Sequence, residues 1–490
     1  MARTSRDVHL HLELAPAGEP LRRRVAAAIV EAVRTGALGP GDVLPASRSL
    51  AADLGISRTV VVDAYDELAA AGYVVTRAGS DTRIAPGADA AARAGVGSHV
   101  APTVLPDENA PNDHRDNTID LSPGYPDTGL ISDRDWRSAW RGVTSAPVPH
   151  RVPGPDEHLL LREALAVHLR RTRGIAVRPD ELVIVPGVLS ALRALAAARG
   201  LSGRHLAFEE PGYSRARHTL ESAGALVRPV PVDHDGLDPA LIRQTDAAVY
   251  CTPAHQYPIG ARMPAARRAR LVSDALTADR LLIEDDYDGE FRYGVSTLPA
   301  LRSIDGGHDC VAYVGTASKI LSPALRLAWL VPPRPMLTAV RQALQISGES
   351  ASTITSAALA RFIESGSLSR HLARAARTYS ARRRSFVDSL RRHLPDVEPS
   401  GVEAGLHVAL RLPDGVDDAA IAAELERRGV TVRGLGAYRI RDDGPRGLLC
   451  GYARLPESRA DAAARVIADV IRESTGAAAG TWDSCTTNGS

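Results

Sequence analysis

The sequence predicts two folded parts, a small N-terminal α+β domain and a larger α/β domain built on a mainly parallel sheet. Three observations lead to this expectation. Short helical patterns separated by turn residues occupy about positions 8–86, and a segment rich in Ala, Gly, Pro, Asp and Asn follows at 87–118. From residue 119 to about 475, short apolar runs alternate with helical patterns. We expect 87–118 to be a linker and 476–490 to be a disordered tail.

The composition is that of an ordinary globular protein, with 44% hydrophobic and 24% charged residues. No run of 18 apolar residues exists, and "MARTSRDVHLHLELAP" lacks the apolar core of a secretory signal. The four cysteines lie far apart and form no CxxC pair, which argues against a zinc site or a disulfide framework. We therefore expect a cytoplasmic protein with no metal site and no membrane contact. A net charge of +1 means that any case for nucleic-acid binding must rest on local features.

The N-terminal part contains three helical patterns and a hairpin. The first, "EPLRRRVAAAIVEAVRTGAL", repeats apolar residues at helical spacing. The second, "LPASRSLAADLG", has Ser47 as a candidate N-cap and Gly55 as its stop, and the third, "ISRTVVVDAYDELAAAGY", begins after Ser57. Two short helices around a glycine turn predict a helix-turn-helix, and "YVVTRAGSDTRIA" supplies a β-hairpin wing.

Several residues of this part are candidates for DNA contact. The start of the last helix of a helix-turn-helix enters the major groove, which places Ser57, Arg58 and Thr59 near DNA, with Arg48 on the preceding helix and Arg83 on the wing. The pattern closely resembles the GntR-type winged helix-turn-helix of bacterial regulators, which implies binding to a double-stranded operator. The alternative is a helical interaction domain with solvated arginines, since residues 1–87 hold ten Arg and ten Asp or Glu.

Seven apolar runs of the larger part predict strands, and polar clusters follow five of them. Because the carboxyl ends of parallel strands meet at one edge of a sheet, these clusters predict a single ligand site. The clusters are "VPGVLS", "EEPGY", "CTPAHQYPIG", "EDDYDGE" and "GTASK". The runs occupy 181–185, 205–210, 225–232, 247–251, 280–285, 311–315 and 327–331.

Lys319, in "GTASK", is the only lysine among 59 basic residues. Unlike arginine, lysine loses its proton readily and attacks a carbonyl to form an imine. Asp285 and Asp286 end the preceding strand and offer a carboxylate for a pyridinium nitrogen. Together these features predict pyridoxal 5'-phosphate as a cofactor. An ordinary surface lysine, spared by chance, is the alternative.

From about residue 15 to 470 the chain resembles MocR/GabR-type regulators, which join a GntR-type domain to a fold-type I, aspartate-aminotransferase-like domain with a small C-terminal α+β subdomain. The resemblance rests on "LREALAVHLRRTRG", "EEPGY", "TPAHQYPIG", "IEDDYDGEFRY", "GTASKILSPALRLAWL" and "GLH". It implies that Lys319 forms the internal aldimine. It also implies that Asp285, with Asp286 as the fallback, pairs with the ring nitrogen, that Tyr287 donates to the ring oxygen and that Tyr213 stacks on the ring.

The resemblance also assigns the remaining contacts. It implies that Thr316, Ser318, Arg326 and the backbone amides of Val188 and Leu189 hold the phosphate. It makes Arg454 the candidate for an effector carboxylate and places His255 and Tyr257 near the cofactor, although a structural role for these two is equally compatible with the sequence.

These features favour a transcriptional regulator that senses pyridoxal phosphate, an amino acid or both through Lys319, and that is not primarily an enzyme. The resemblance implies a homodimer. Two alternatives stay open: a working aminotransferase that carries a DNA-binding domain, and a DNA-binding protein that uses the larger fold only to dimerise.

Overall fold

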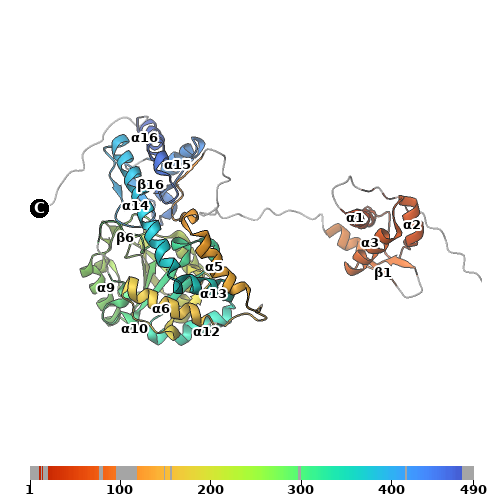
Figure 1. Cartoon of the computed structure of the whole chain (residues 1–490), viewed down its shortest axis with the longest axis horizontal. Coiled ribbons are helices and arrows are strands. Elements are labelled where there is room, and N and C mark those ends of the chain that lie inside the picture. Colours follow the sequence, from red (N-terminus) through yellow and green to blue (C-terminus); the bar gives the residue numbers. More distant parts are fainter. Residues whose placement is uncertain are drawn as a thin grey trace, which may run out of the picture. The chain divides into compact units, whose positions relative to one another are not determined.

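The computed structural model describes residues 10, 12, 14, 20–76, 81–94, 118–147, 149–154, 157–295, 299–413 and 416–476. The chain divides into two compact units, Met1–Asn112 and Asp113–Ser490 (Figure 1). None of the described helices is both long and apolar enough to cross a membrane. Residues 477–490 of the predicted tail, and Gly79 and Ser80 of the predicted wing turn, lie outside the described residues.

The N-terminal unit is a winged helix-turn-helix, as predicted. The wing pairs its strands antiparallel, with Val74 opposite Ile84. Apolar faces of the helices meet in one core that includes Val25, Ile29, Leu50, Val61 and Leu68. The elements are α1 (Leu21–Arg34), α2 (Ser47–Leu54), α3 (Arg58–Ala70), β1 (Val74–Thr76), β2 (Thr82–Ile84) and α4 (Ala88–Ala94).

Two details of this unit differ from the expectation. Ser47 is the first residue of α2 and not its N-cap, which is Ala46 without a side-chain cap bond. The segment expected to be a linker begins with α4, whose Ala88 and Ala92 are buried in the N-terminal core. Alanine has the highest helix propensity, so "ADAAARA" forms a helix without the large apolar residues that reveal one in sequence.

The larger unit is built on an eight-stranded sheet in the order β4-β11-β10-β9-β8-β5-β6-β7. All strands run parallel except β11 and β7. All seven predicted strands are present, with ends within two residues of the prediction. Their bounds are β4 (Val183–Val185), β5 (His205–Glu210), β6 (Leu226–Asp233), β7 (Gly236–Leu237), β8 (Asp246–Cys251), β9 (Leu281–Asp286), β10 (Val311–Thr316) and β11 (Ala328–Val331).

Helices cover both faces of this sheet. Successive side chains of a strand point to opposite faces, so Ile283 of β9 packs with one helix group and Leu282 with another. The Ile283 face is covered by α7 (Val188–Arg199), α8 (Ser214–Ser222) and α12 (Leu337–Ser347). The other face is covered by α5 (Asp133–Thr144), α6 (Leu159–Arg173), α9 (Ala265–Thr277), α10 (Gly307–Cys310) and α13 (Thr353–Glu364).

A smaller α+β part completes this unit. The long helix α14 (Ser367–His393) contacts both α13 and α16 (Ala460–Gly476), as Figure 1 shows. Beside α16 lie α15 (Asp418–Arg427) and a sheet of β12 (Pro399–Ser400), β13 (His407–Arg411), β16 (Gly447–Gly451) and β15 (Arg433–Gly434). The first strand of the unit, β3 (Ile119–Asp120), pairs parallel with β14 (Val430–Thr431), so the start of this unit is tied to its smaller part.

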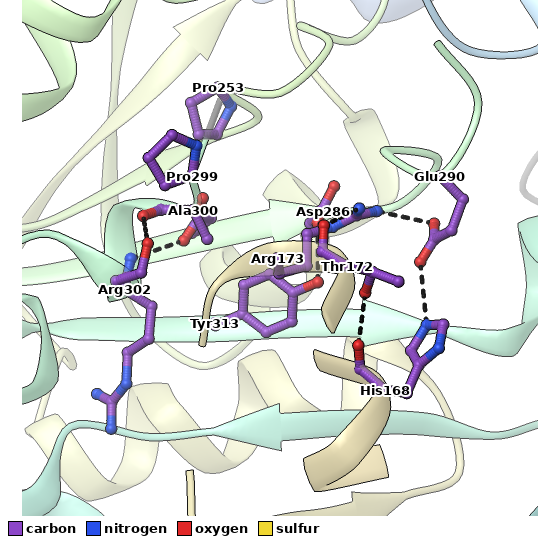
Figure 2. A network of polar contacts seen from close by, with 12 residues as sticks. His168, Thr172, Arg173, Pro253, Asp286, Glu290, Pro299, Ala300, Arg302 and Tyr313 are labelled. Atoms are coloured by element: carbon purple, nitrogen blue, oxygen red, sulfur yellow. Dashed lines mark hydrogen bonds and ion pairs between the residues drawn. The ribbon is translucent and has the colours of Figure 1, made fainter. Parts of the chain in front are cut away.

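A buried ionic cluster lies under the carboxyl end of β9. The Arg173 guanidinium, at the end of α6, donates to Asp286 and lies 3.0 Å from Glu290 (Figure 2). The Tyr313 hydroxyl of β10 donates to the same Asp286 carboxylate at 2.7 Å. Arg173 and Asp286 side chains are 4% and 3% exposed, so water does not screen the pair. A Cβ at Gly289 would contact Asp286, so only glycine fits where the loop crosses the cluster.

We predict that Arg173→Met destabilises the larger unit by about 3–5 kcal/mol, because Asp286 and Glu290 stay buried without their cation. Urea unfolding followed by tryptophan fluorescence measures this unit alone, since residues 1–112 contain no tryptophan. Arg267→Met is the matched control, because its ion pair with Asp233 is more exposed and is expected to contribute less than about 1 kcal/mol. Equal stability of the two variants would contradict the assignment.

Candidate functional site

Lys319 lies at the carboxyl edge of the sheet, where β10 leads into α11 (Ala317–Ile320). The Thr316 hydroxyl accepts a hydrogen bond from the Ser318 amide at 3.1 Å, which caps this short helix. A Cβ at Gly124, whose φ is +77°, would lie 2.8 Å from Lys319 Nζ, so this glycine makes room for the amine. Loss of solvation lowers the pKa of Lys319 to about 8, and the negative charges of Asp288 and Asp285 oppose part of this shift.

Asp285 presents one unbonded carboxylate oxygen to the same region. Its Oδ2 accepts from the Tyr250 hydroxyl at 2.6 Å, while Oδ1 is buried and has no hydrogen-bond partner among the described residues. Burial raises the pKa of Asp285 to about 7, and Lys319 opposes the shift. A buried acceptor without a donor suits the protonated ring nitrogen of a pyridoxal group, so the residues present fit the predicted cofactor.

Asp286, the fallback for this role, points to the opposite face of β9. Figure 2 shows it held by Arg173 and Tyr313. Asp286 Oδ1 is also buried without a hydrogen-bond partner among the described residues, but Asp286 lies with Arg173 on the other side of the strand, so Asp285 is the carboxylate on the side of Lys319.

Tyr287 belongs to a polar group behind the site. Its hydroxyl lies 3.0 Å from His255 Nδ1, and that nitrogen lies 3.0 Å from Asp288 Oδ2. His407 packs its ring 5.0 Å from that of His255, and burial holds the pKa of His407 well below its usual value. His255, Asp288 and His407 also place ligand atoms within 4.8 Å of one another, the one such group among the described residues. Hydrogen bonds engage His255 Nδ1 and His407 Nε2, whereas His255 Nε2, His407 Nδ1 and Asp288 Oδ1 are buried without a hydrogen-bond partner among the described residues.

Aromatic rings line the site on another side. Tyr257 packs edge-to-face against Tyr213 at 5.9 Å and against Tyr287 at 5.5 Å. Its hydroxyl donates to that of Tyr438 at 3.1 Å. The structure therefore brings Tyr213, Tyr257 and Tyr287 together.

Arg326 and the first amides of α7, which are among the groups predicted to hold phosphate, lie close together. The N-terminal amides of a helix, here those of Val188 and Leu189, have no acceptor within the helix and favour anions. A Cβ at the N-cap, Gly187, would lie 3.7 Å from the Arg326 guanidinium, so Arg326 reaches this helix start. Arg326 precedes β11, and because β11 runs antiparallel its first residue lies at the same edge as the ends of the parallel strands.

Arg454 is already engaged. Its guanidinium donates to Asp120 Oδ2 at 2.5 Å and lies 4.9 Å from the centre of the Tyr125 ring. Lys319 Nζ lies over the same ring, at 5.8 Å. The Tyr125 ring thus lies close to both Arg454, the predicted effector residue, and Lys319, the predicted cofactor residue.

Sequence reasoning missed Tyr125, Tyr250, Asp288 and Arg215, whose positive charge contributes to the lowered pKa of Lys319. Asp288 and Arg215 lie in or next to motifs that were singled out. Tyr125 and Tyr250 have no local signal, because their partners are distant in sequence.

The predicted DNA contacts lie on the exposed side of the helix-turn-helix. Ser57 is the N-cap of α3, and its hydroxyl makes no cap bond. Arg58 Nε donates to the Ser47 hydroxyl at 3.3 Å, which ties the start of α3 to α2. Thr59 and Arg48 are exposed, and Arg83 donates to the Gly41 carbonyl at 3.0 Å.

Comparison with known proteins matches both units. Residues 21–84 match bacterial regulatory proteins of the gntR family, and residues 116–467 match aminotransferase class I and II. The HTH-type pyridoxine biosynthesis transcriptional regulator PdxR of Corynebacterium glutamicum is 35% identical over 86% of this chain and 89% of its own length. The probable rhizopine catabolism regulatory protein MocR of Rhizobium meliloti is 32% identical, over 89% and 90%. Among solved structures, an archaeal alanine:glyoxylate aminotransferase superposes with a TM-score of 0.68 at 26% identity, over 73% of this chain and 91% of its own.

We predict that the Lys319 amine loses its proton near pH 8 in the folded chain, because burial disfavours the charged form. With a single lysine, carbon-13 labelling of lysine Cε gives one NMR signal, whose shift against pH reports this pKa. The urea-unfolded chain is the control and should titrate near 10.5. A midpoint near 10.5 in the folded chain would contradict the burial of the amine.

Proposed function

The chain belongs to the helix-turn-helix transcriptional regulators that join a gntR-family domain to an aminotransferase class I and II domain, and from this membership we propose that it binds an operator and senses pyridoxal 5'-phosphate, an amino acid or both. The observation that carries the proposal is the only lysine of the chain, with its lowered pKa, beside the unbonded oxygen of Asp285. Such a regulator acts on chromosomal DNA in the cytoplasm.

Each side chain of the site has a defined role in this proposal. Bound pyridoxal phosphate supplies a carbonyl that links to amines and a ring that withdraws electrons. Lys319 would provide the amine for the link, and Asp285 Oδ1 would accept a hydrogen bond from the protonated ring nitrogen. Tyr287 would donate to the ring oxygen, and Tyr213 would cover the ring face. The phosphate would be held by Thr316, Ser318, Arg326 and the amides of Val188 and Leu189, and His255 and Tyr257 would lie beside the cofactor.

The amino-acid effector is assigned to the side of the site where Arg454 lies. A guanidinium binds a carboxylate with two parallel hydrogen bonds, and the same Tyr125 ring faces both Arg454 and Lys319. An amino acid whose amine reaches the Lys319 region can therefore place a carboxylate near Arg454.

We also propose that the regulator is a homodimer. Apolar side chains that a monomer would leave in water gather on α6 and just before it, with Val152 at 75%, Leu159 at 54%, Leu160 at 51% and Val167 at 60% exposure. Burial of such side chains against a second copy is favourable. Two winged helices in one dimer would read two half-sites.

A working aminotransferase is the second candidate, favoured by the similarity of the larger unit to a solved aminotransferase over 91% of that protein. Steady-state transfer of an amino group to a keto acid at about 1 per second or faster would establish that activity.

We predict that Lys319→Ala removes both the visible absorbance of the bound cofactor and any response of DNA binding to amino acids. Lys319→Arg is the control that keeps a positive charge but lacks the reactive amine. The measurement is fluorescence anisotropy with DNA from upstream of the protein's own gene, with and without pyridoxal phosphate and the twenty amino acids. If neither pyridoxal phosphate nor any of the twenty amino acids changed the DNA affinity of the wild type, that result would contradict the sensing proposal.

We predict that Arg58→Ala weakens operator binding by about tenfold, because Arg58 lies at the start of the helix that enters the groove. If Arg58 contacts a phosphate, the slope of log affinity against log salt falls by about one. Arg34→Ala is the control, since Arg34 ends α1 in an ion pair with Glu31. An equal loss in both variants would contradict this placement of the DNA surface.

A further inference from the structure

Asp120 occupies the guanidinium that the proposed effector needs. Arg454 donates to Asp120 Oδ2 at 2.5 Å, and the amide of Ser122 donates to Asp120 Oδ1 at 2.8 Å. Both oxygens of this carboxylate are thus engaged, one by Arg454 and one by the backbone of its own loop. The position of Asp120 is therefore set by the chain, with its second oxygen directed at Arg454.

This ion pair differs from the structural pair beneath the sheet. The side chains of Arg454 and Asp120 are 30% and 20% exposed, whereas those of Arg173 and Asp286 are 4% and 3% exposed. Water screens a partly exposed pair, so its net contribution is small and another carboxylate can replace it. The buried pair cannot be exchanged in this way, because each partner would be left without compensation.

The Arg454–Asp120 pair also adjoins the site itself. Arg454 lies 4.9 Å and Lys319 Nζ 5.8 Å from the centre of the same Tyr125 ring. A ligand that reached the Lys319 region and carried a carboxylate would bring a second negative group to the guanidinium that Asp120 holds. Asp120 uses the Nη2 donor of Arg454, and a ligand carboxylate that binds this guanidinium with two parallel hydrogen bonds needs the same donor, so the two carboxylates compete for it.

The segment that carries Asp120 is the first described part of the larger unit after residues 95–117. Its backbone is held by three bonds, from the Ile119 amide to the Gly429 carbonyl at 2.7 Å, from the Leu121 amide to Thr431 at 2.9 Å, and from the Gly451 amide to Leu121 at 2.7 Å. These bonds do not involve the Asp120 side chain, so the strand stays paired when the carboxylate is released. What changes is the side-chain attachment between this segment and Arg454.

We propose that Asp120 is an internal competitor for the effector carboxylate, and that a ligand must displace it from Arg454 to bind. This inference rests on the proposed function and deepens it. It makes the ligand class a carboxylate, in preference to an amine or a neutral molecule, because a guanidinium is attracted by the charge of an anion and not by a neutral acceptor to the same extent. Ligand binding then breaks one specific contact, the ion pair of Asp120 with Arg454, and Asp120 follows the segment that leads from the DNA-binding unit.

With an internal competitor, the apparent dissociation constant of a ligand equals its intrinsic value divided by the fraction of chains in which the arginine is free. Removing the competitor should therefore raise affinity without adding any contact to the ligand. Asp120→Asn does this with little change in volume and leaves an oxygen that can still accept from the Ser122 amide.

The test uses the full chain without cofactor and succinate as the probe, a dicarboxylate with no amine. The single carbon-13 signal of Lys319 reports binding in the site. We expect Asp120→Asn to bind succinate about three- to tenfold more tightly than wild type. Asp127→Asn is the matched control, because Asp127 lies in the same loop and pairs with Arg382 at 2.8 Å and not with Arg454. Its succinate affinity should equal that of wild type.

An Asp120→Asn affinity equal to or lower than that of wild type overturns the proposal. So does an increase of the same size in Asp127→Asn, because it would reflect loosening of the loop and not competition at Arg454. When Arg454→Met is already present, adding Asp120→Asn should leave the succinate affinity unchanged, and a difference that persists also counts against the proposal. Since the unloaded chain is used, the outcome is separate from whether pyridoxal phosphate binds, which the visible absorbance of the loaded chain decides.

Discussion

The contact of Arg173 with Asp286 and Glu290 fixes the end of β9, and the geometry of the site depends on it. Neighbouring residues of a strand face opposite sides of the sheet, so holding Asp286 on one side sets Asp285 on the other. Tyr313 adds a hydrogen bond from the adjacent strand to the same carboxylate. One buried cation thus holds Asp286 on the far side of the strand, so that Asp285, and not Asp286, offers its unbonded oxygen on the side of Lys319.

The chain uses ion pairs of two kinds, and burial separates their tasks. The pair of Arg173 and Asp286 excludes water and fixes the frame, whereas the pair of Arg454 and Asp120 remains partly solvated and can be exchanged. Burial also shifts the pKa values of the amine and of one carboxylate of the site. Burial brings the pKa of Lys319 down to about 8 and that of Asp285 up to about 7, so both groups can change protonation state near neutral pH when a ligand arrives.

Local pattern predicted much of this protein and failed where distant segments meet. The seven strands and the helix-turn-helix follow from periodicity, and Lys319 stands out because only lysine suits its chemistry. Periodicity does not predict strand direction. Only the structure shows that β11 runs antiparallel and so brings Arg326 to the edge of the sheet. Tyr125 and Asp120 meet Lys319 and Arg454 only through tertiary packing, and α4 escaped notice because alanine gives no apolar period.

The central claim is that reversible chemistry at Lys319 controls DNA binding. The most direct measurement compares the operator affinity of one loaded sample before and after borohydride makes the bond between Lys319 and the cofactor permanent, each with and without the amino acid that gives the largest response. The account predicts that the untreated sample responds and that the reduced sample, with cofactor still in place, does not. An equal response in both samples would contradict it.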